Sequence, residues 1–175
     1  DQEVPGYVTH VRIHKSVKII TRNAFRNCRY LVSIEMHDGV EIIEEEAFFL
    51  CNSLREVKLL GVRVIGARAF KNCTALEDVK FGYKLESIGD DAFYQCNSLR
   101  NIKLSKIRVI GDGAFCDCKQ LTEVELSEDL ETVGRAALAY CPRLRRITIP
   151  LKDNLLQDNS VFVECDALSQ VDLVG

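Results

Sequence analysis

Residues 88–104 read Ile-Gly-Asp-Asp-Ala-Phe-Tyr-Gln-Cys-Asn-Ser-Leu-Arg-Asn-Ile-Lys-Leu, and this pattern recurs along almost the whole chain. The phenylalanine position is occupied in turn by Phe25, Phe48, Phe70, Phe93, Phe115, Leu138 and Phe162. A cysteine follows each of them three residues later, at Cys28, Cys51, Cys73, Cys96, Cys118, Cys141 and Cys165. A fixed period of 22–24 residues is the signature of a repeat architecture.

Each repeat has two parts with different periodicities. Ala92, Phe93, Cys96 and Leu99 have spacings that place them on one face of a short helix. The next residues alternate apolar and polar side chains, which is typical of a strand with one buried face. We therefore expect a short helical turn and then a strand in every repeat. The expected strands are centred on Val11, Ile34, Val57, Val79, Ile102, Val124, Ile147 and Val171.

A single repeat is too small to enclose a core, so successive copies must stack. We predict one leucine-rich repeat domain over residues 1–175, with about seven coils of 22–24 residues plus an N-terminal strand. The predicted fold is a right-handed solenoid with one parallel β-sheet on its concave face and short helical turns on its convex face. Five phenylalanines, from Phe25 to Phe115, should form a buried stack. An Ile-Gly pair such as Ile88-Gly89 should form the turn between coils.

The repeats resemble a known family. Residues 88–102 and residues 110–124 are similar to the BspA-like leucine-rich repeat unit, I-G-x-x-A-F-x-x-C-x-x-L-x-x-V, and the likeness extends over residues 8–173. The resemblance implies a binding scaffold, often on microbial or protist surfaces, without enzymatic activity and therefore without catalytic residues.

A longer period overlies the repeat. Residues 51–59 and residues 96–104 share Cys-Asn-Ser-Leu-Arg at a distance of 45 residues, which indicates duplication of repeat pairs. The last coil differs from the others because residues 151–160 contain an additional residue and a polar segment, so we expect a bulged loop there.

The eight cysteines permit three interpretations: disulfides, a metal site or a row of buried thiols. Seven of them occupy the same inward position of successive coils, an arrangement that suits neither convergent zinc ligands nor disulfide geometry. We therefore expect reduced thiols and no bound metal. Cys116 directly follows Phe115 and should be an exposed thiol. Unpaired thiols favour an intracellular site, while a cell-surface or secreted location stays open.

Composition and motifs narrow the function. Apolar residues make up 47% of the chain and the net charge is −3, so no overall basic field attracts nucleic acid. No apolar run is long enough for direct membrane insertion. The only histidines are His10, His14 and His37, and neither a nucleophile–base motif nor a phosphate-binding loop occurs. We therefore predict that the chain is not an enzyme and that it uses no cofactor.

The exposed side of the predicted sheet is the candidate binding face. Three lysines fall at equivalent positions of neighbouring strands, and acidic, polar, basic and aromatic residues accompany them. The candidate residues for partner binding are Lys58, Lys80, Lys103, Glu56, Asp78, Asn101, Arg55, Arg100 and Tyr83. They are either an anchor for an acidic protein or peptide, or a solvated face on which opposite charges balance.

These observations predict a non-catalytic scaffold that binds a protein or peptide on its concave sheet face. Two alternatives stay open: a surface adhesin-like module, or a structural subunit that docks through its ends. The second rests on the strand at the C-terminus, because an uncapped solenoid leaves edge groups and core residues uncovered. Edge contacts would then involve residues 168–175. Because the chain begins with Asp1, we expect it to be a fragment of a longer protein.

Overall fold

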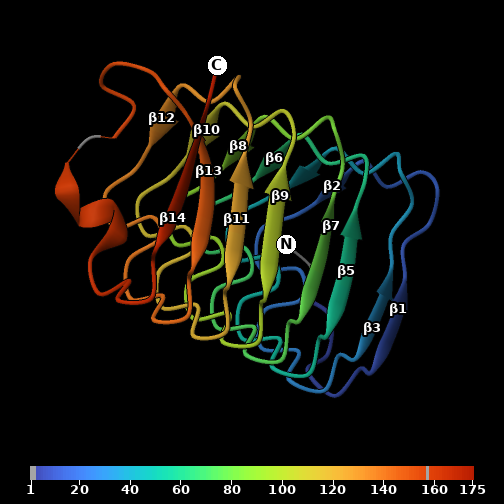
Figure 1. Ribbon diagram of the computed structural model, residues 1–175. Helices are drawn as coiled ribbons and strands as arrows, with labels where there is room; N and C mark the ends of the chain where they lie inside the picture. The colour runs from blue at the N-terminus through green and yellow to red at the C-terminus, as the bar shows by residue number, and fades with distance from the viewer. Residues whose placement is uncertain (1–2, 157) are drawn as a thin grey trace.

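The Val-x-Leu segment of every repeat is a strand in the computed structural model, which describes residues 3–156 and 158–175 (Figure 1). These long strands are β1 (His10–Arg12), β3 (Ser33–Glu35), β5 (Glu56–Leu59), β7 (Asp78–Phe81), β9 (Asn101–Leu104), β11 (Glu123–Leu126), β13 (Arg146–Pro150) and β14 (Gln170–Val174). All strand pairings among the described residues are parallel, and they align equivalent residues, such as Val57 with Val79 and Ile147 with Val171. The eight predicted strand positions and the solenoid are confirmed.

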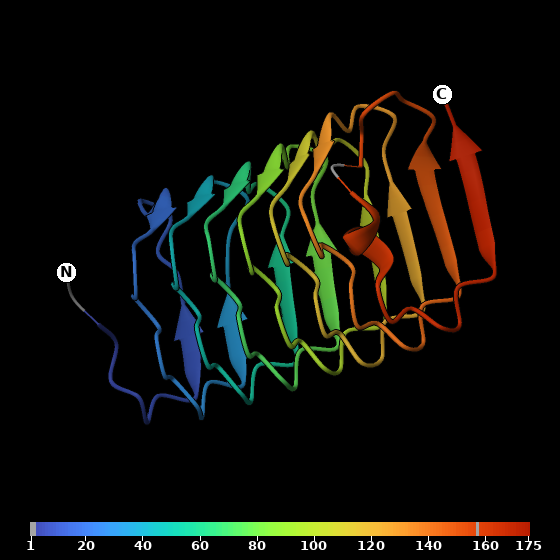
Figure 2. The same ribbon diagram turned by 90° about the vertical axis from the view of Figure 1, so that its left-hand side faces the viewer.

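A second parallel sheet, which was not predicted, lies opposite the long strands (Figure 2). Its six strands are β2 (Ile19–Ile20), β4 (Ile42–Ile43), β6 (Val64–Ile65), β8 (Ser87–Ile88), β10 (Val109–Ile110) and β12 (Thr132–Val133). The ladder is continuous from β2 to β12. Two residues are too few to show an alternating pattern in a sequence, which is why this short-strand sheet was missed.

A glycine follows four of the six short strands, β6, β8, β10 and β12, and it allows the backbones of neighbouring coils to approach closely. A Cβ atom added at Gly89 would stand 2.6 Å from the backbone nitrogen of Ala67 in the preceding coil. Such a distance is shorter than real Cβ contacts, so a side chain would push the coils apart. Gly89 has no left-handed backbone, and the expected strained turn is therefore not the reason for this residue.

The predicted helical turns are wrong. The Ala-Phe-x-x-Cys segments are chains of tight turns, and the only helix among the described residues is the short 3₁₀ segment η1 (Asn159–Phe162). In the second coil, Asn23 and Asn27 adopt φ angles of 61° and 60°, which no helix permits. The amides of Ala24, Arg26 and Cys28 bond within the coil, while those of Asn23, Phe25 and Asn27 bond to the next coil. A helix would direct all these amides along its own axis, and this part of each coil would then form no backbone hydrogen bonds to the next coil.

The aromatic core is built as the repeat predicts. Phe25, Phe48, Phe70, Phe93 and Phe115 form one continuous stack with ring centroids 4.9 to 5.2 Å apart. Each ring lies nearly parallel to the next, with interplanar angles from 3° to 7°. The row of cysteines lies beside this stack, fully buried in the central coils. Each thiol donates to a carbonyl of the preceding coil; for example, Cys96 donates to Phe70 at 3.3 Å.

Cys116 corrects an expectation. Its side chain was predicted to be exposed, but the residue is 7% exposed and belongs to the buried class. It lies in a row between Tyr94 and Ala139 of the adjacent coils, and the Gln95 amide bonds to its carbonyl. Because its side chain is short, the neighbouring coils cover it, whereas longer side chains in the same row reach solvent.

The last coil is irregular, as the additional polar segment predicts. Leu156 pairs with Val133 in an isolated bridge that extends the short-strand sheet, and η1 follows with Asp158 as its cap. Gln157, within the expected bulged loop, lies outside the described residues. Strand β14 then ends the long-strand row. Its Val171 and Leu173 are 52% and 59% exposed, although the equivalent residues of β13 are buried.

Candidate functional site

The outward side chains of the long strands alternate with the buried ones and form an exposed surface that we call the long-strand face. It corresponds to the predicted concave face. On β5, Val57 and Leu59 are buried, while Glu56 and Lys58 between them are exposed. The same alternation holds on β9 and β11. The strand pattern therefore frees the outward positions from packing constraints and makes them available to a ligand.

The backbone pairing of this face is interrupted twice. Hydrogen-bonded ladders join β1 to β3, β5 to β7, and β9 through β11 and β13 to β14. Strand β3 lies beside β5, and β7 beside β9, without a ladder between them in the described chain. Each interruption precedes a coil that begins with Cys-Asn-Ser-Leu, so the two are 45 residues apart. The duplication of repeat pairs is thus visible in the sheet.

Serine hydroxyls mark both interruptions. Ser53 donates to the Arg29 carbonyl at 2.6 Å, and Ser98 donates to the Thr74 carbonyl at 2.7 Å. Where a ladder joins two strands, a backbone amide takes the place of the serine hydroxyl. It belongs to the residue two positions before the centre of the later strand; the Glu77 amide, for example, donates to the Arg55 carbonyl at 2.8 Å. Within the described residues, the equivalent amides of Arg55 and Arg100 have no backbone acceptor.

A cleft opens on the long-strand face at each interruption. The N-terminal cleft extends over β1, β3 and β5 and has a volume of about 670 Å³. The C-terminal cleft extends over β7, β9, β11 and β13 and has a volume of about 740 Å³. Met36, which directly follows β3, and Phe81, the last residue of β7, are only half-buried there, whereas Leu59 and Leu104 at equivalent positions are fully buried. Each cleft therefore has an apolar floor under a charged rim.

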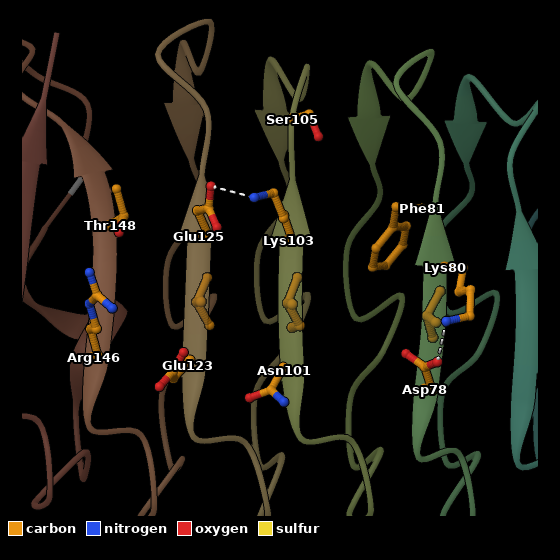
Figure 3. Close-up of a pocket in the computed structure, with 13 residues that line it drawn as sticks. Asp78, Lys80, Phe81, Asn101, Lys103, Ser105, Glu123, Glu125, Arg146 and Thr148 are labelled. Carbon is orange, nitrogen blue, oxygen red and sulfur yellow. Dashed lines mark ion pairs between the residues drawn. The ribbon is translucent and has the colours of Figure 1, made fainter.

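Ion pairs alter the predicted lysine row. Lys80 and Lys103 both lie at the C-terminal cleft but turn away from each other (Figure 3). The Lys80 ammonium lies 3.2 Å from Asp78 on its own strand, and that of Lys103 lies 3.0 Å from Glu125 on β11. Lys58 is exposed and forms no ion pair among the described residues. Two of the three lysines, Lys80 and Lys103, are therefore paired with a carboxylate, and the charge of Lys58 is not.

The other predicted residues are brought together only in part. Arg55 lines the N-terminal cleft with Glu56 and Lys58. Asn101 lines the C-terminal cleft and accepts a hydrogen bond from the Thr122 hydroxyl at 3.0 Å. Arg100 directs its guanidinium to Glu77, at 3.7 Å. Tyr83 is 74% exposed in the loop after β7 and lines a separate hollow with Lys84 and Glu86. It therefore does not belong to the long-strand patch.

Several cleft residues were missed by the sequence analysis. Met36 and Phe81 occupy core positions of the repeat, which predicts full burial, but the structure leaves both of them half-buried at the clefts. Lys15 and Arg12 come from the first coil, where the repeat is least regular. The 45-residue period was the one signal that could have placed two equivalent sites on this face.

The reactive side chains are held in unreactive settings. Burial raises the pKa of the Cys116 thiol from its ordinary value of 9.0 to about 11. The His37 ring bonds to the His14 carbonyl at 3.0 Å through one nitrogen and accepts the Gly39 amide through the other. In residues 3–156 and 158–175, His, Cys, Asp and Glu side chains form no group of three or more able to hold a metal ion. Nor does any helix of that part combine the length and apolar character that spanning a bilayer requires.

Comparison with known proteins identifies the repeat and the fold. Six copies of the BspA type leucine-rich repeat region match residues 6–106 and 60–169. A leucine-rich repeat protein of T. pallidum is 27% identical, with a TM-score of 0.67 over 93% of this chain and 72% of that one. One from Eubacterium ventriosum is 25% identical, with a TM-score of 0.82 over 94% of this chain and 45% of that one.

No curated protein matches the chain significantly. The family match covers far more than half of the sequence and rests on the same Ala-Phe-x-x-Cys-x-x-Leu unit that builds the coils. The chain therefore belongs to the BspA-type leucine-rich repeat family.

Proposed function

We propose that the chain is a non-catalytic interaction module that binds a protein or peptide partner on its long-strand face. The observation that carries the proposal is the pair of clefts on this face, each with exposed charged side chains around a half-buried apolar residue. Protein interfaces combine these two features, since apolar contacts supply affinity and charges supply orientation and specificity. Membership of a leucine-rich repeat family favours the same function.

The chemistry of the reactive groups favours binding over catalysis. The inward thiols are buried, and burial raises the pKa of Cys96 well above its ordinary range, so this thiol stays protonated. His37 uses both ring nitrogens in hydrogen bonds within its own loop and to the preceding coil. A Cys–His nucleophile pair would need a reactive thiolate beside a free imidazole.

Charge reversal tests the proposed face. Lys58→Glu, Lys80→Glu and Lys103→Glu in one chain should weaken capture of an acidic partner, and the loss should be larger at low salt, where the attraction of the lysines is less screened. The matched control is Arg63→Glu with Arg108→Glu, because both residues lie beside the short-strand sheet and are 45 residues apart. Partners would be captured on the immobilised chain and identified by mass spectrometry. If the lysine variant still bound the partner and the control variant did not, the interface would lie outside the long-strand face.

A second candidate is docking through the C-terminal end. The exposed Val171 and Leu173 favour it, because they occupy core positions of the repeat without a following coil over them in this structure. Substituting Val171→Lys and Leu173→Lys should abolish partner capture if the end is the interface and leave it unchanged if the long-strand face is.

A further inference from the structure

The two clefts on the long-strand face differ in charge. The N-terminal cleft is lined by four basic and two acidic side chains, Arg12, Lys15, Arg55, Lys58, Glu35 and Glu56, an excess of two positive charges. The C-terminal cleft has three of each sign, Lys80, Lys103, Arg146, Asp78, Glu123 and Glu125. Each cleft includes one interruption of the ladder, but the two offer different electrostatic surfaces to a ligand.

Pairing within the clefts increases this difference. In the C-terminal cleft, each basic residue has a carboxylate partner, including Arg146, which lies 2.6 Å from Asp172. In the N-terminal cleft, only Arg12 is paired, at 2.7 Å from Glu35. The cations of Lys15, Arg55 and Lys58 form no ion pair within the described chain, and all three residues are exposed. An incoming carboxylate would therefore not have to displace an existing partner there.

The N-terminal cleft also offers apolar contact. Val32 on its wall is 45% exposed, Met36 is half-buried, and Ile34 between them is 8% exposed. Arg55, Lys58 and Lys15 line the same cleft. Unpaired cations around an apolar floor match a peptide that presents both carboxylates and an apolar side chain.

We propose that the N-terminal cleft is the primary recognition site of the long-strand face and binds an acidic peptide segment with one apolar side chain. Lys15, Arg55 and Lys58 receive the carboxylates, and the apolar side chain lies on Val32 and Met36. This inference rests on the proposed function and deepens it. A peptide suits the site better than a nucleic acid, because a peptide can place an apolar side chain on Val32 and Met36 between its carboxylates, whereas a nucleic acid presents a continuous phosphate backbone.

Fluorescence anisotropy with labelled peptides tests the proposal on the 175-residue chain. Glu-Glu-Leu-Glu-Glu should bind more tightly than Glu-Glu-Ser-Glu-Glu, and Lys-Lys-Leu-Lys-Lys should not bind. Arg55→Glu with Lys58→Glu should weaken the first peptide by at least about tenfold. The equivalent pair 45 residues later, Arg100→Glu with Lys103→Glu, should weaken it by less than about threefold. Circular dichroism verifies that both variants fold, which is expected because all four side chains are exposed.

The apolar part of the site has its own test. Val32→Ser should weaken the leucine peptide and leave the weaker serine peptide unchanged. The proposal is overturned if no peptide binds, if a short thymidine oligonucleotide binds as tightly as the acidic leucine peptide, or if the two double variants lose affinity equally. In the last case the long-strand face would still be the binding face and the proposed function would stand. Loss of binding only in Arg63→Glu with Arg108→Glu would contradict both.

Discussion

Single residues of the repeat have roles that follow from their positions in the stack. Phe93 lies between Phe70 and Phe115 at centroid distances of 5.1 and 5.2 Å, and it also makes a T-shaped contact with Phe81 at 5.7 Å. Offset stacking and complete burial make such a ring hard to replace. The sequence predicted this row correctly because one residue type recurs at a constant interval, and stacked coils bring equivalent positions together.

Replacing one ring of the stack should measure that contribution. Phe93→Ala removes a fully buried side chain and leaves a cavity, so the free energy of unfolding should fall by about 3 to 5 kcal/mol. Tyr83→Ala, at a residue that is 74% exposed, should change it by less than about 0.5 kcal/mol. Urea unfolding monitored by circular dichroism provides both values. A loss below about 1 kcal/mol for Phe93→Ala would show that the ring does not belong to the core.

The thiols should make stability depend on alkaline pH. Burial raises the pKa of Cys28 and of Cys116 from 9.0 to about 11 in the folded chain. Between these values the folded state keeps protons that the unfolded state releases, so the free energy of unfolding should fall as the pH rises from about 9 towards 11. Denaturant melts across this range test the direction, and Cys96→Ala, which lacks one buried thiol, should show a shallower decline. Stability that increases over this range would contradict the burial of the thiols.

Strands and turns show where sequence reasoning succeeded and where it failed. The alternating Val-x-Leu segments predicted the long strands because one face of each is buried, as on β9. The spacing of Ala92, Phe93, Cys96 and Leu99 is compatible both with a helix and with a chain of tight turns, because both structures direct these side chains inward. Left-handed residues such as Asp91 and Gln95, with φ angles of 54° and 56°, decide in favour of turns. Neither residue type is specific for that conformation, so the sequence contained no clear signal.

Amide exchange should locate the two interruptions of the long-strand ladder. The Glu77 and Thr122 amides donate to Arg55 and Arg100 carbonyls across paired junctions, both at 2.8 Å. The equivalent amides of Arg55 and Arg100 have no backbone acceptor within the described residues and should exchange with solvent at least about tenfold faster. Hydrogen exchange followed by NMR resolves these four amides individually. Equal protection of all four would mean that the ladder is continuous and that the clefts are closed in solution.

At the scale of the whole molecule, the two sheets differ in the continuity of their backbone hydrogen bonding. The short-strand ladder runs unbroken from β2 to β12, while the long-strand row divides into three ladders. The sequence predicted the stacking of the coils and the face that carries the charges. It could not predict which charges remain unpaired, because pairing depends on side-chain direction across strands, as for Lys103 with Glu125.

The C-terminal end of the stack should be the least stable part of the 175-residue chain. Val171 and Leu173 are exposed, and β14 pairs only with β13 in the described structure. We expect the chain either to self-associate through this end or to fray there, and Val171→Lys with Leu173→Lys should suppress self-association. Light scattering over a concentration series measures association, and hydrogen exchange of residues 168–173 measures fraying. A strict monomer in which these residues are as protected as β9 would exclude an open edge.

The central claim is that ligands bind on the long-strand face. The most direct measurement is hydrogen exchange of the chain with and without its captured partner, analysed coil by coil. When the partner binds, we expect slower amide exchange at β3, at β5 and at the residues between Val32 and Lys58 that line the N-terminal cleft. Exchange along the short-strand sheet should not change. Protection confined to the short strands, or to residues 168–175, would contradict it.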